Sequence, residues 1–326
     1  MDFDQILSFD LELSKDQKHL LHLGAVLGNE QLEIRNDTSL ATEKLNVLAA
    51  KAKFVLGHNI IAHDLPWLKQ QQQQHSNDAQ HLQRLPIIDT LFLSPLAFPK
   101  NPYHRLIKGY KIISDSYNNP VQDAKLALGI FLDQLEAFRQ QYQVNPHLIE
   151  LYHYLFSTNE SRELDTHGLA QIMASVIKGD RDRKVEILLA NCMVDKACPN
   201  QLRSLIKDFR NKKVSSLCLA YAAAWLQVAG GDSVLPPWVW RQFPLVKVII
   251  RQLRETRCGD NSCQYCEENF NARNYLQRFF ELHDFRLLAD GKPLQNDLVN
   301  AAINGDPLLG ILPTGGGKSL CFQLPA

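Results

Sequence analysis

The sequence predicts an α/β protein that opens as an α+β arrangement, continues as a mainly helical connector and closes with the start of a P-loop domain. Apolar and polar residues alternate over residues 9–13, as in a strand with one buried face. From about residue 146 to residue 257 the apolar spacing is mainly helical, and a glycine-rich loop follows near the C-terminus. We therefore expect three parts, at residues 1–143, 144–281 and 282–326.

The first part begins with three short strands within residues 1–35. Period two places the carboxylates of Asp10 and Glu12 on the same face of the first strand. A helix is expected over residues 41–51, followed by a buried strand over residues 54–56. A polar strand face usually points to solvent, so these two acids alone are weak evidence for a site.

Two further acids occupy positions that strengthen the case. Asp64 comes just after the buried strand, at the start of a helix. Asp123 lies in the first turns of another helix, which Asn119 is expected to cap with Pro120 in its first turn. Four carboxylates that converge in this way can hold a pair of Mg²⁺ ions, which activate water and stabilise the leaving oxygen in phosphodiester cleavage. Between these acids, the glutamine run within Lys69–Gln74 predicts an exposed loop.

This set of acids resembles the DEDD family of 3′–5′ exonucleases, which have a ribonuclease H-like fold with a mixed sheet. Asp10 and Glu12 match the first motif of the family, Asn59 and Asp64 the second, and Asp123 the third. The resemblance implies that the four acids bind Mg²⁺ or Mn²⁺ and act in catalysis. It also implies that Asn59 contacts the substrate and that the partner is DNA with single-stranded 3′ ends.

The sequence departs from this family at the general base. One subclass has histidine where this chain has Asn118, and an amide cannot take a proton from water. The other subclass needs tyrosine at the position of Asn119, whereas Tyr117 lies two residues earlier. His63 and His104 are the nearest substitutes, although a surface or core role is the more common one for each. The alternative function is a weakly catalytic DNA clamp or an interaction module.

Cysteines are concentrated in one short segment. Cys258, Cys263 and Cys266 form a tight cluster, and Cys192 or Cys198 is expected to supply the fourth ligand of a tetrahedral Zn²⁺ site. Iron–sulfur ligation and unligated thiols are the alternatives.

The segment Pro313–Ala326 carries a nucleotide-binding motif. Its glycines allow backbone N–H groups to surround a triphosphate, its lysine can reach the β- and γ-phosphates, and its serine can ligate Mg²⁺. The amino-acid sequence of this segment resembles the first motif of RecQ-type superfamily-2 DNA helicases, and the resemblance extends over about residues 282–326. The resemblance implies that Gln295 hydrogen-bonds adenine and that Phe285 stacks on it. The implied ATP-binding residues are Phe285, Gln295, Thr314, Gly315, Gly316, Gly317, Lys318 and Ser319.

Only seven residues follow Ser319, so we expect a motor that is incomplete in this chain, with its remainder encoded separately or lost in a split gene. The chain has 326 residues and a formal net charge of zero, so DNA binding has to come from local basic patches. With no apolar run long enough to span a bilayer and no signal peptide, a cytoplasmic location without membrane contact is expected. The expected function is 3′–5′ exonuclease processing joined to ATP-dependent DNA unwinding.

Overall fold

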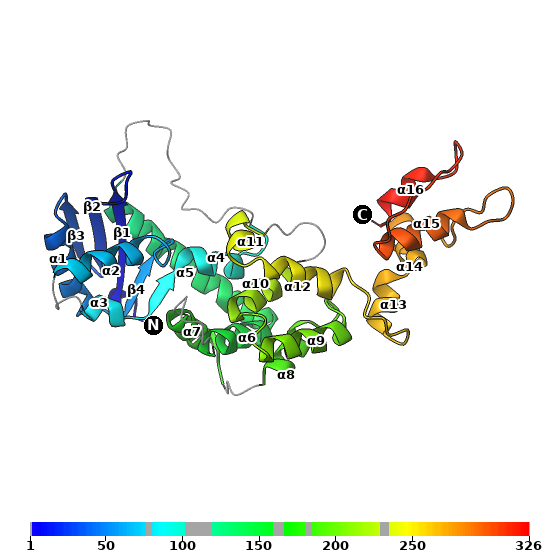
Figure 1. Cartoon of the computed structure of the whole chain (residues 1–326). Helices are drawn as coiled ribbons and strands as arrows, with labels where there is room; N and C mark the ends of the chain where they lie inside the picture. The colour runs from blue at the N-terminus through cyan, green and yellow to red at the C-terminus, as the bar shows by residue number, and fades with distance from the viewer. Residues whose placement is uncertain are drawn as a thin grey trace. The chain divides into compact units, whose positions relative to one another are not determined.

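The computed structural model describes residues 2–75, 80–101, 119–158, 166–179, 184–228 and 235–325 (Figure 1). The chain forms two compact units. The first contains residues 1–192 and 209–247, and the second contains residues 193–208 and 248–326. The boundaries expected from the sequence at residues 143 and 281 stay predictions.

The first unit is built on a five-stranded mixed sheet, which confirms the α/β class. Its strand order is β3-β2-β1-β4-β5. The first three strands are antiparallel neighbours, while β4 runs parallel to both β1 and β5. The bounds are β1 Ile6–Leu13, β2 Leu20–Leu27, β3 Glu30–Arg35, β4 Phe54–Gly57 and β5 Ile87–Asp89, after a 3₁₀ turn at Phe3–Gln5.

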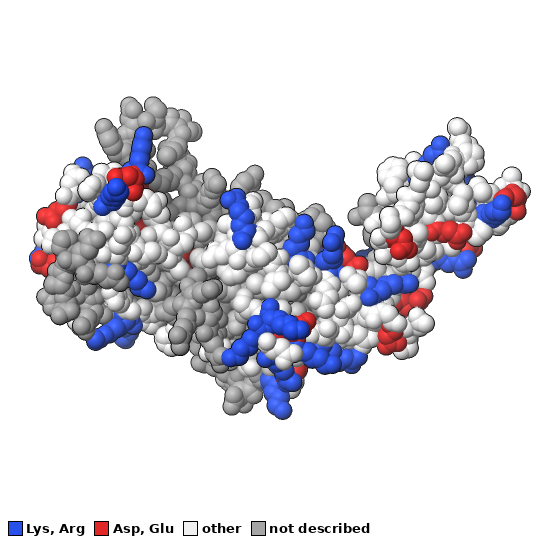
Figure 2. Space-filling model, viewed as in Figure 1, with Lys and Arg blue, Asp and Glu red and all other residues white. Residues whose placement is uncertain are grey.

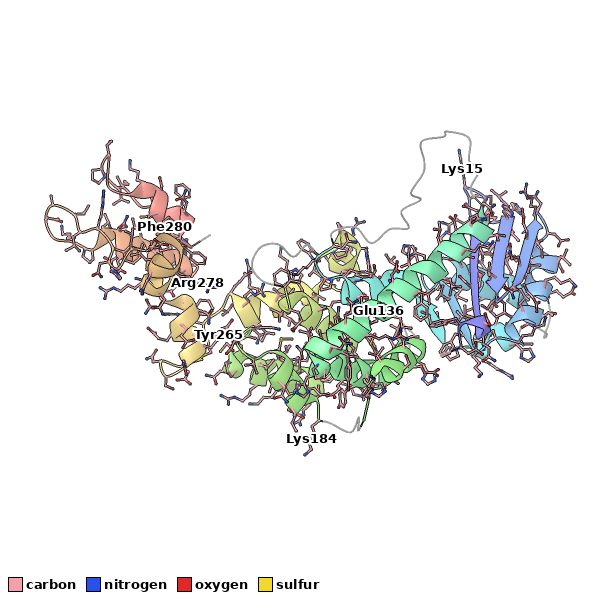
Figure 3. All side chains as sticks on the ribbon, turned by 180° about the vertical axis from the view of Figure 1, so that it is seen from behind. Lys15, Glu136, Lys184, Tyr265, Arg278 and Phe280 are labelled. Atoms are coloured by element: carbon pink, nitrogen blue, oxygen red, sulfur yellow. The ribbon has the colours of Figure 1, made fainter. Side chains whose placement is uncertain are left out.

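Helices cover both faces of this sheet. The long helix α5 (Pro120–Val144) lies across one face, as Figure 3 shows from behind, where Glu136 marks its middle turns. On the other face lie α1 (Thr38–Ala49), α2 (Asp64–His75) and α3 (Gln80–Arg84). Leu7, Phe9 and Leu11 of β1 point toward these three helices and belong to their core. The alternate residues of β1 therefore face α5.

The glutamine run is a correction to the sequence analysis. The backbone is helical from Asp64 to His75, so the expected loop over Lys69–Gln74 is the second half of α2. The first turns of this helix bury Leu65, Trp67 and Leu68 against the sheet. Glutamine is a good helix former, so a helix anchored in this way continues through the run.

The rest of the first unit is helical, as the sequence predicts. Tyr221 of α10 is fully buried, donates a hydrogen bond from its hydroxyl to the backbone oxygen of Phe92 at 3.0 Å, and packs on the ring of Trp238. These contacts join the helical part to the sheet part within one unit. Its further helices are α4 Thr90–Ala97, α6 Pro146–Ser157, α7 His167–Val176, α8 Val185–Cys192, α10 Ser216–Leu226 and α11 Pro237–Gln242.

The second unit has short helices and small apolar clusters. One cluster contains five buried residues, among them Leu276 and Phe285, and the other contains Cys198, Cys266 and Phe270. The helices are α13 Gln264–Phe270, α14 Ala272–Phe280, α15 Leu294–Ile303 and α16 Lys318–Gln323, while α9 Pro199–Arg210 and α12 Leu245–Arg254 each contain a boundary between the units. None of the described helices is long and apolar enough to cross a membrane.

Charge is unevenly distributed on the visible face. Lys and Arg side chains gather over α9 in Figure 2, where few acidic side chains appear. Arg203, Lys207 and Arg210 of this helix are exposed, and their spacing places them on one stripe, opposite the buried Leu202 and Leu205. The neutral total charge therefore conceals a local basic stripe.

Candidate exonuclease, nucleotide and metal sites

Strand β1 and helix α5 together position three of the four predicted acids. Asp10 and Glu12 project from the face of β1 that α5 covers, and Asp123 lies in the first turn of α5. One carboxylate oxygen from each of these residues lies within 4.8 Å of the others. Asp123 is 5% exposed, and the other two are half-buried. The structure thus brings together acids that are far apart in the sequence.

Two contacts hold the start of α5 against the sheet at this point. The Ser8 hydroxyl donates a hydrogen bond to the backbone oxygen of Ala124 at 2.7 Å. Gly24 of β2, which pairs with Asp10, has no side chain, so the helix backbone can approach closely. A Cβ atom at Gly24 would lie 2.1 Å from the nitrogen of Val121 and 2.2 Å from the carbonyl carbon of Pro120. Neither residue was predicted from the sequence, although a glycine inside a strand is a known sign of close backbone approach.

The cap of α5 confirms one local prediction. The side-chain oxygen of Asn119 accepts hydrogen bonds from the backbone nitrogens of Val121 and Gln122, and Pro120 occupies the first helical position. This cap satisfies helical N–H groups that would otherwise lack a partner. Asn118, Tyr117 and His104, on which the general-base argument depends, lie outside the described residues.

Asp64 sits beside the acidic group at the start of α2. Its Oδ1 atom accepts a hydrogen bond from the backbone nitrogen of Leu11, which lies between Asp10 and Glu12, at 3.0 Å. Burial raises the pKa of Asp64, against the effect of its contact with His63. The Nδ1 atom of His63 lies 3.7 Å from Asp64 Oδ2.

The same group of acids affects the pKa of His63. Its close contact with the Asp64 carboxylate is the main reason why the pKa of His63 is raised, and the charges of Asp64, Asp10 and Glu12 add to this effect. The His63 side chain is 41% exposed. It therefore stands at the edge of the acidic group, open to solvent.

The loop that carries Asn59 is fixed by Asp89. The backbone nitrogens of Asn59 and Ile61 donate to the two carboxylate oxygens of Asp89, each at 3.0 Å, and the nitrogen of Leu91 donates at 2.9 Å. Asn59 itself adopts a left-handed conformation with φ 65°. Asp89 is fully buried, and this burial raises its pKa to about 6. Asp89 thus shapes the loop before Asp64.

The nucleotide-binding motif forms a loop before α16. Gly315 and Gly317 adopt left-handed conformations, with φ 78° and 74°. Thr314, Lys318 and Ser319 are exposed, and Gly316 is half-buried. The loop thus offers its polar side chains to solvent.

The expected adenine-binding residues make contacts of a different kind. The Gln295 Oε1 atom accepts a hydrogen bond from the backbone nitrogen of Arg286 at 2.9 Å, and its Nε2 donates to the oxygen of Gly317 at 3.2 Å. Phe285 is 8% exposed and packs in a small core, which leaves little ring surface for a base. Arg286 also donates to the backbone oxygen of Gly315 at 3.2 Å. Residues 285–295 therefore brace the phosphate loop in this structure.

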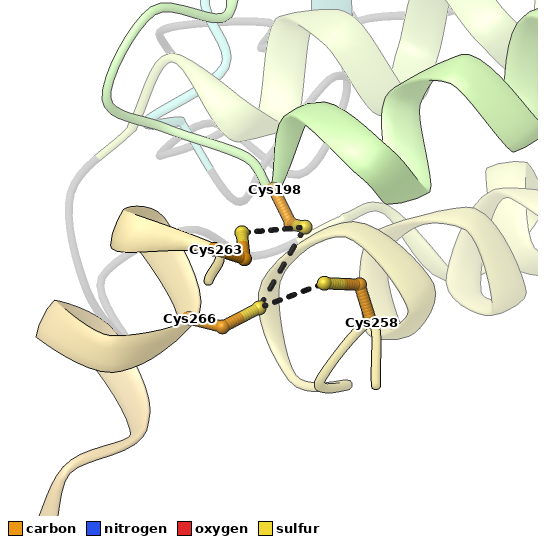
Figure 4. A group of neighbouring side chains, drawn as sticks. All are labelled: Cys198, Cys258, Cys263 and Cys266. Atoms are coloured by element: carbon orange, nitrogen blue, oxygen red, sulfur yellow. Dashed lines mark hydrogen bonds between the residues drawn. The ribbon is translucent and has the colours of Figure 1, made fainter. Parts of the chain in front are cut away.

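The structure shows that Cys198, and not Cys192, lies with the three clustered cysteines. Sulfur atoms of Cys198, Cys258, Cys263 and Cys266 all lie within 4.8 Å of one another (Figure 4). Cys192 does not belong to this group. It is buried in α8 of the first unit, where its thiol donates to the backbone oxygen of Leu189.

Comparison with known proteins gives matches only over short regions. No family model matches the chain, and no solved structure matches it. The rat "ATP-dependent DNA helicase Q1" is 37% identical over 73 residues, 21% of this chain and 11% of that protein. The yeast "ATP-dependent helicase SGS1" is 47% identical over 47 residues, 14% of this chain and 3% of that protein. A Bacillus subtilis "Probable ATP-dependent DNA helicase RecS" is 42% identical over 50 residues, 15% of this chain and 9% of that protein.

A short part of this chain is related to RecQ-type DNA helicases. The chain spans 3 to 11% of the length of these three relatives. The printed names of these three relatives are those of ATP-dependent helicases. These matches carry no information about exonuclease activity.

Proposed function

We propose that the first unit is a 3′–5′ exonuclease domain that works with a RecQ-type motor. The observation that carries the proposal is the convergence of Asp10, Glu12 and Asp123, whose carboxylate oxygens lie within 4.8 Å of one another. Asp64 is bound to the backbone of the same strand. Three carboxylates this close, with that of Asp64 beside them, repel each other, and divalent cations would relieve that repulsion.

The donor set fits Mg²⁺ or Mn²⁺, because hard cations prefer carboxylate oxygens. When bound, a pair of such ions supplies an activated water and stabilises the leaving 3′ oxygen of the scissile phosphodiester. Asp10 and Glu12 would hold the ions from the sheet, while Asp123 and Asp64 would hold them from two helix starts. Asn59, on the loop before Asp64, would position the DNA strand. The five-stranded mixed sheet agrees with the ribonuclease H-like fold that this activity implies.

His63 is the described residue best placed to accept the proton from the attacking water. It lies 3.7 Å from Asp64, at the solvent-exposed edge of the acidic group. With Asn118 in place of the usual histidine, another base is needed for efficient cleavage. We therefore include His63 in the proposal as the general base.

The second unit would supply the nucleotide-binding edge of the motor. We assign the helicase likeness to a stretch that includes the phosphate loop; the match to the rat helicase covers 21% of this chain and is therefore longer than residues 282–326. Gly315, Gly316, Gly317, Lys318 and Ser319 would bind the phosphates of ATP and its Mg²⁺, with Thr314 beside them. The two hydrogen bonds of Gln295 use one of its N–H donors and one of its acceptor lone pairs, so one of each would be left to read adenine. ATP hydrolysis and DNA unwinding would require further motor elements besides this segment.

The test uses 5′-labelled single-stranded DNA with Mn²⁺ and compares the wild type with three variants. Asp10→Asn removes one charge at nearly constant volume, and Glu30→Gln is the matched control, because Glu30 is an exposed acid of β3 that pairs with Lys51. We expect stepwise shortening by the wild type and by Glu30→Gln, and a loss of at least about 100-fold in Asp10→Asn. His63→Gln should lose about 100-fold or more if it acts as the base. Equal shortening by Asp10→Asn and the wild type would contradict the site assignment.

A DNA clamp is the second candidate, because the residue expected as base is an amide. Arg203 and Lys207 of the basic stripe on α9 suit phosphate contacts without any chemistry, whereas Arg210 is paired with Glu186. Binding of single-stranded DNA in Mn²⁺ with no shortening by the wild type would favour the clamp. Binding together with shortening would favour the exonuclease.

A further inference from the structure

Four cysteines from separate parts of the second unit meet with the spacing of ligands around one ion. The Sγ atom of Cys198 lies 3.7 Å from that of Cys263 and 3.6 Å from that of Cys266, and Cys266 lies 3.6 Å from Cys258 (Figure 4). These distances are far longer than a disulfide bond of about 2.05 Å. All four cysteines are free thiols.

The spacing matches a tetrahedral metal–thiolate site. With a zinc–sulfur bond of about 2.3 Å, a regular tetrahedron separates its sulfur atoms by about 3.8 Å. An iron–sulfur cluster distributes its cysteines over several iron atoms, so its cysteine sulfurs lie farther apart than ligands of one ion. We propose that Cys198, Cys258, Cys263 and Cys266 form a structural Zn²⁺ site, separate from the proposed exonuclease and nucleotide sites.

The surrounding residues are arranged as supports for such a site. The Asn200 amide donates to the Cys258 sulfur at 3.2 Å and to Asp260 at 3.0 Å, and hydrogen bonds to sulfur stabilise thiolate ligands. Gly259 adopts a left-handed conformation with φ 79°, which turns the chain directly after Cys258. Cys263 and Cys266 stand one turn apart at the start of α13. The sequence analysis missed Asn200 because it lies 58 residues before its cysteine partner.

Further contacts bring the segment of Cys198 to the other three ligands. The backbone nitrogen of Cys198 donates to the oxygen of Leu253 at 3.3 Å. The hydroxyl of Tyr265, on α13 in Figure 3, donates to the oxygen of Lys196 at 3.3 Å. Phe270 packs against Cys198 and Cys266 on the apolar side of the group. The fourth ligand is thus held in place by its neighbours on both sides.

A metal at this position would supply stability that the local core does not. Among the described residues, the apolar cluster around the cysteines has three buried members, namely Cys198, Cys266 and Phe270. In small domains the free energy of zinc binding replaces a large core, and the thiols release their protons as they bind. The ion would join the start of α9, which follows Cys198 directly, to α13. It would therefore fix the helix that carries the basic stripe.

The test is metal analysis of the full chain, purified without chelator, with a matched pair of variants. Cys198→Ser and Cys192→Ser each place a hydroxyl at a buried cysteine, and only Cys198 belongs to the group. We expect one zinc per chain in the wild type and in Cys192→Ser, and at least about a tenfold weaker zinc affinity in Cys198→Ser. Cys258→Ser, at a half-buried position, serves if Cys198→Ser fails to fold. Replacement of zinc by Co²⁺ should give the intense visible absorption of a tetrahedral thiolate site.

Three outcomes would overturn the proposal. The first is a folded wild type that binds neither zinc nor Co²⁺, which would leave four unligated thiols. The second is stoichiometric iron with iron–sulfur absorption. The third is equal zinc affinity in Cys198→Ser, Cys258→Ser and the wild type. None of these measurements depends on nuclease or ATPase activity.

Discussion

Gly24 offers the sharpest test of how the acidic group is assembled. In Gly24→Ala the new Cβ would lie 2.1 Å from the backbone nitrogen of Val121, and this atom cannot move without its helix. Carbon atoms in contact prefer about 3.5–4.0 Å, so the start of α5 has to move by about 1.5 Å. Gly24 does not have a positive φ, so the substitution adds a steric clash without backbone strain.

The displacement is large compared with what a metal site tolerates. Asp123 lies two residues beyond Val121 and would move with it, whereas ligand distances have to stay within about 0.2 Å. A misplacement of about 1 Å can cost about 100-fold in rate. We therefore expect Gly24→Ala to weaken Mn²⁺ binding and strand shortening by about 100-fold. Overpacking should also lower the free energy of unfolding by about 1–3 kcal/mol.

The assay measures Mn²⁺ binding by calorimetry and unfolding by urea, alongside strand shortening. Gly129→Ala is the matched control, because a Cβ there has nothing within 4 Å and the residue lies on the same helix. That change should leave Mn²⁺ affinity unchanged and raise stability by up to about 1 kcal/mol, since alanine favours helix. Wild-type stability together with wild-type Mn²⁺ affinity in Gly24→Ala would refute the reasoning. Mn²⁺ affinity is read separately from cleavage, so it remains informative if the domain is a clamp.

Three other predictions concern buried polar groups. Asp89 has a pKa raised by burial from 3.8 to about 6, so the folded state binds its proton more tightly than the unfolded state. The stability that Asp89 contributes is therefore largest below about pH 4 and is lost as pH rises through about 6, by on the order of 1–3 kcal/mol. Urea titrations at several pH values give the free energy of unfolding of the wild type and of Asp89→Asn. The difference between the two should fall as pH rises, and a difference that stays constant with pH would contradict the prediction. Tyr221→Phe should cost about 1 kcal/mol in thermal unfolding, because it loses the bond to Phe92, whereas Tyr152→Phe should cost nothing, since the Tyr152 hydroxyl is buried without a partner among the described residues. A similar loss in both tyrosine variants would argue against this difference. Gln295→Ala should speed amide hydrogen exchange at Arg286, whose nitrogen donates to Gln295, and unchanged exchange would show that this bond is not important for the loop.

Local patterns were enough to predict the elements that have a strong period or cap. The strand with Asp10 and Glu12 follows from alternation, and the start of α5 follows from Asn119 and Pro120. Both depend on residues close in sequence, so no tertiary information was needed. The structure brings the carboxylates of Asp10, Glu12 and Asp123 together, and Asp64 accepts a hydrogen bond from the backbone of the strand that carries the first two.

The features that were missed depend on distant partners. Cys192 and Cys198 are equivalent by spacing, and only the fold shows that Cys198 approaches residues 258–266. The glutamine run lacks an apolar period of its own, so it was assigned to a loop although the buried turn before it sustains the helix. Phe285 matches a motif, but its burial comes from packing with Leu276 and Val299. Tertiary contacts decided each of these cases.

The chain passes from the first unit to the second and back again, and this limits how the gene segments for the two units can be exchanged in evolution. Residues 193–208 belong to the second unit, although residues 209–247 return to the first. A single recombination crossover between these stretches would therefore separate Cys198 from Cys258, Cys263 and Cys266. A gene fusion that transfers the whole cysteine group must carry residues 193–266 as one block, together with the α10 and α11 helices of the other unit. Inheritance of the two units is thus linked by chain topology, whatever their activities.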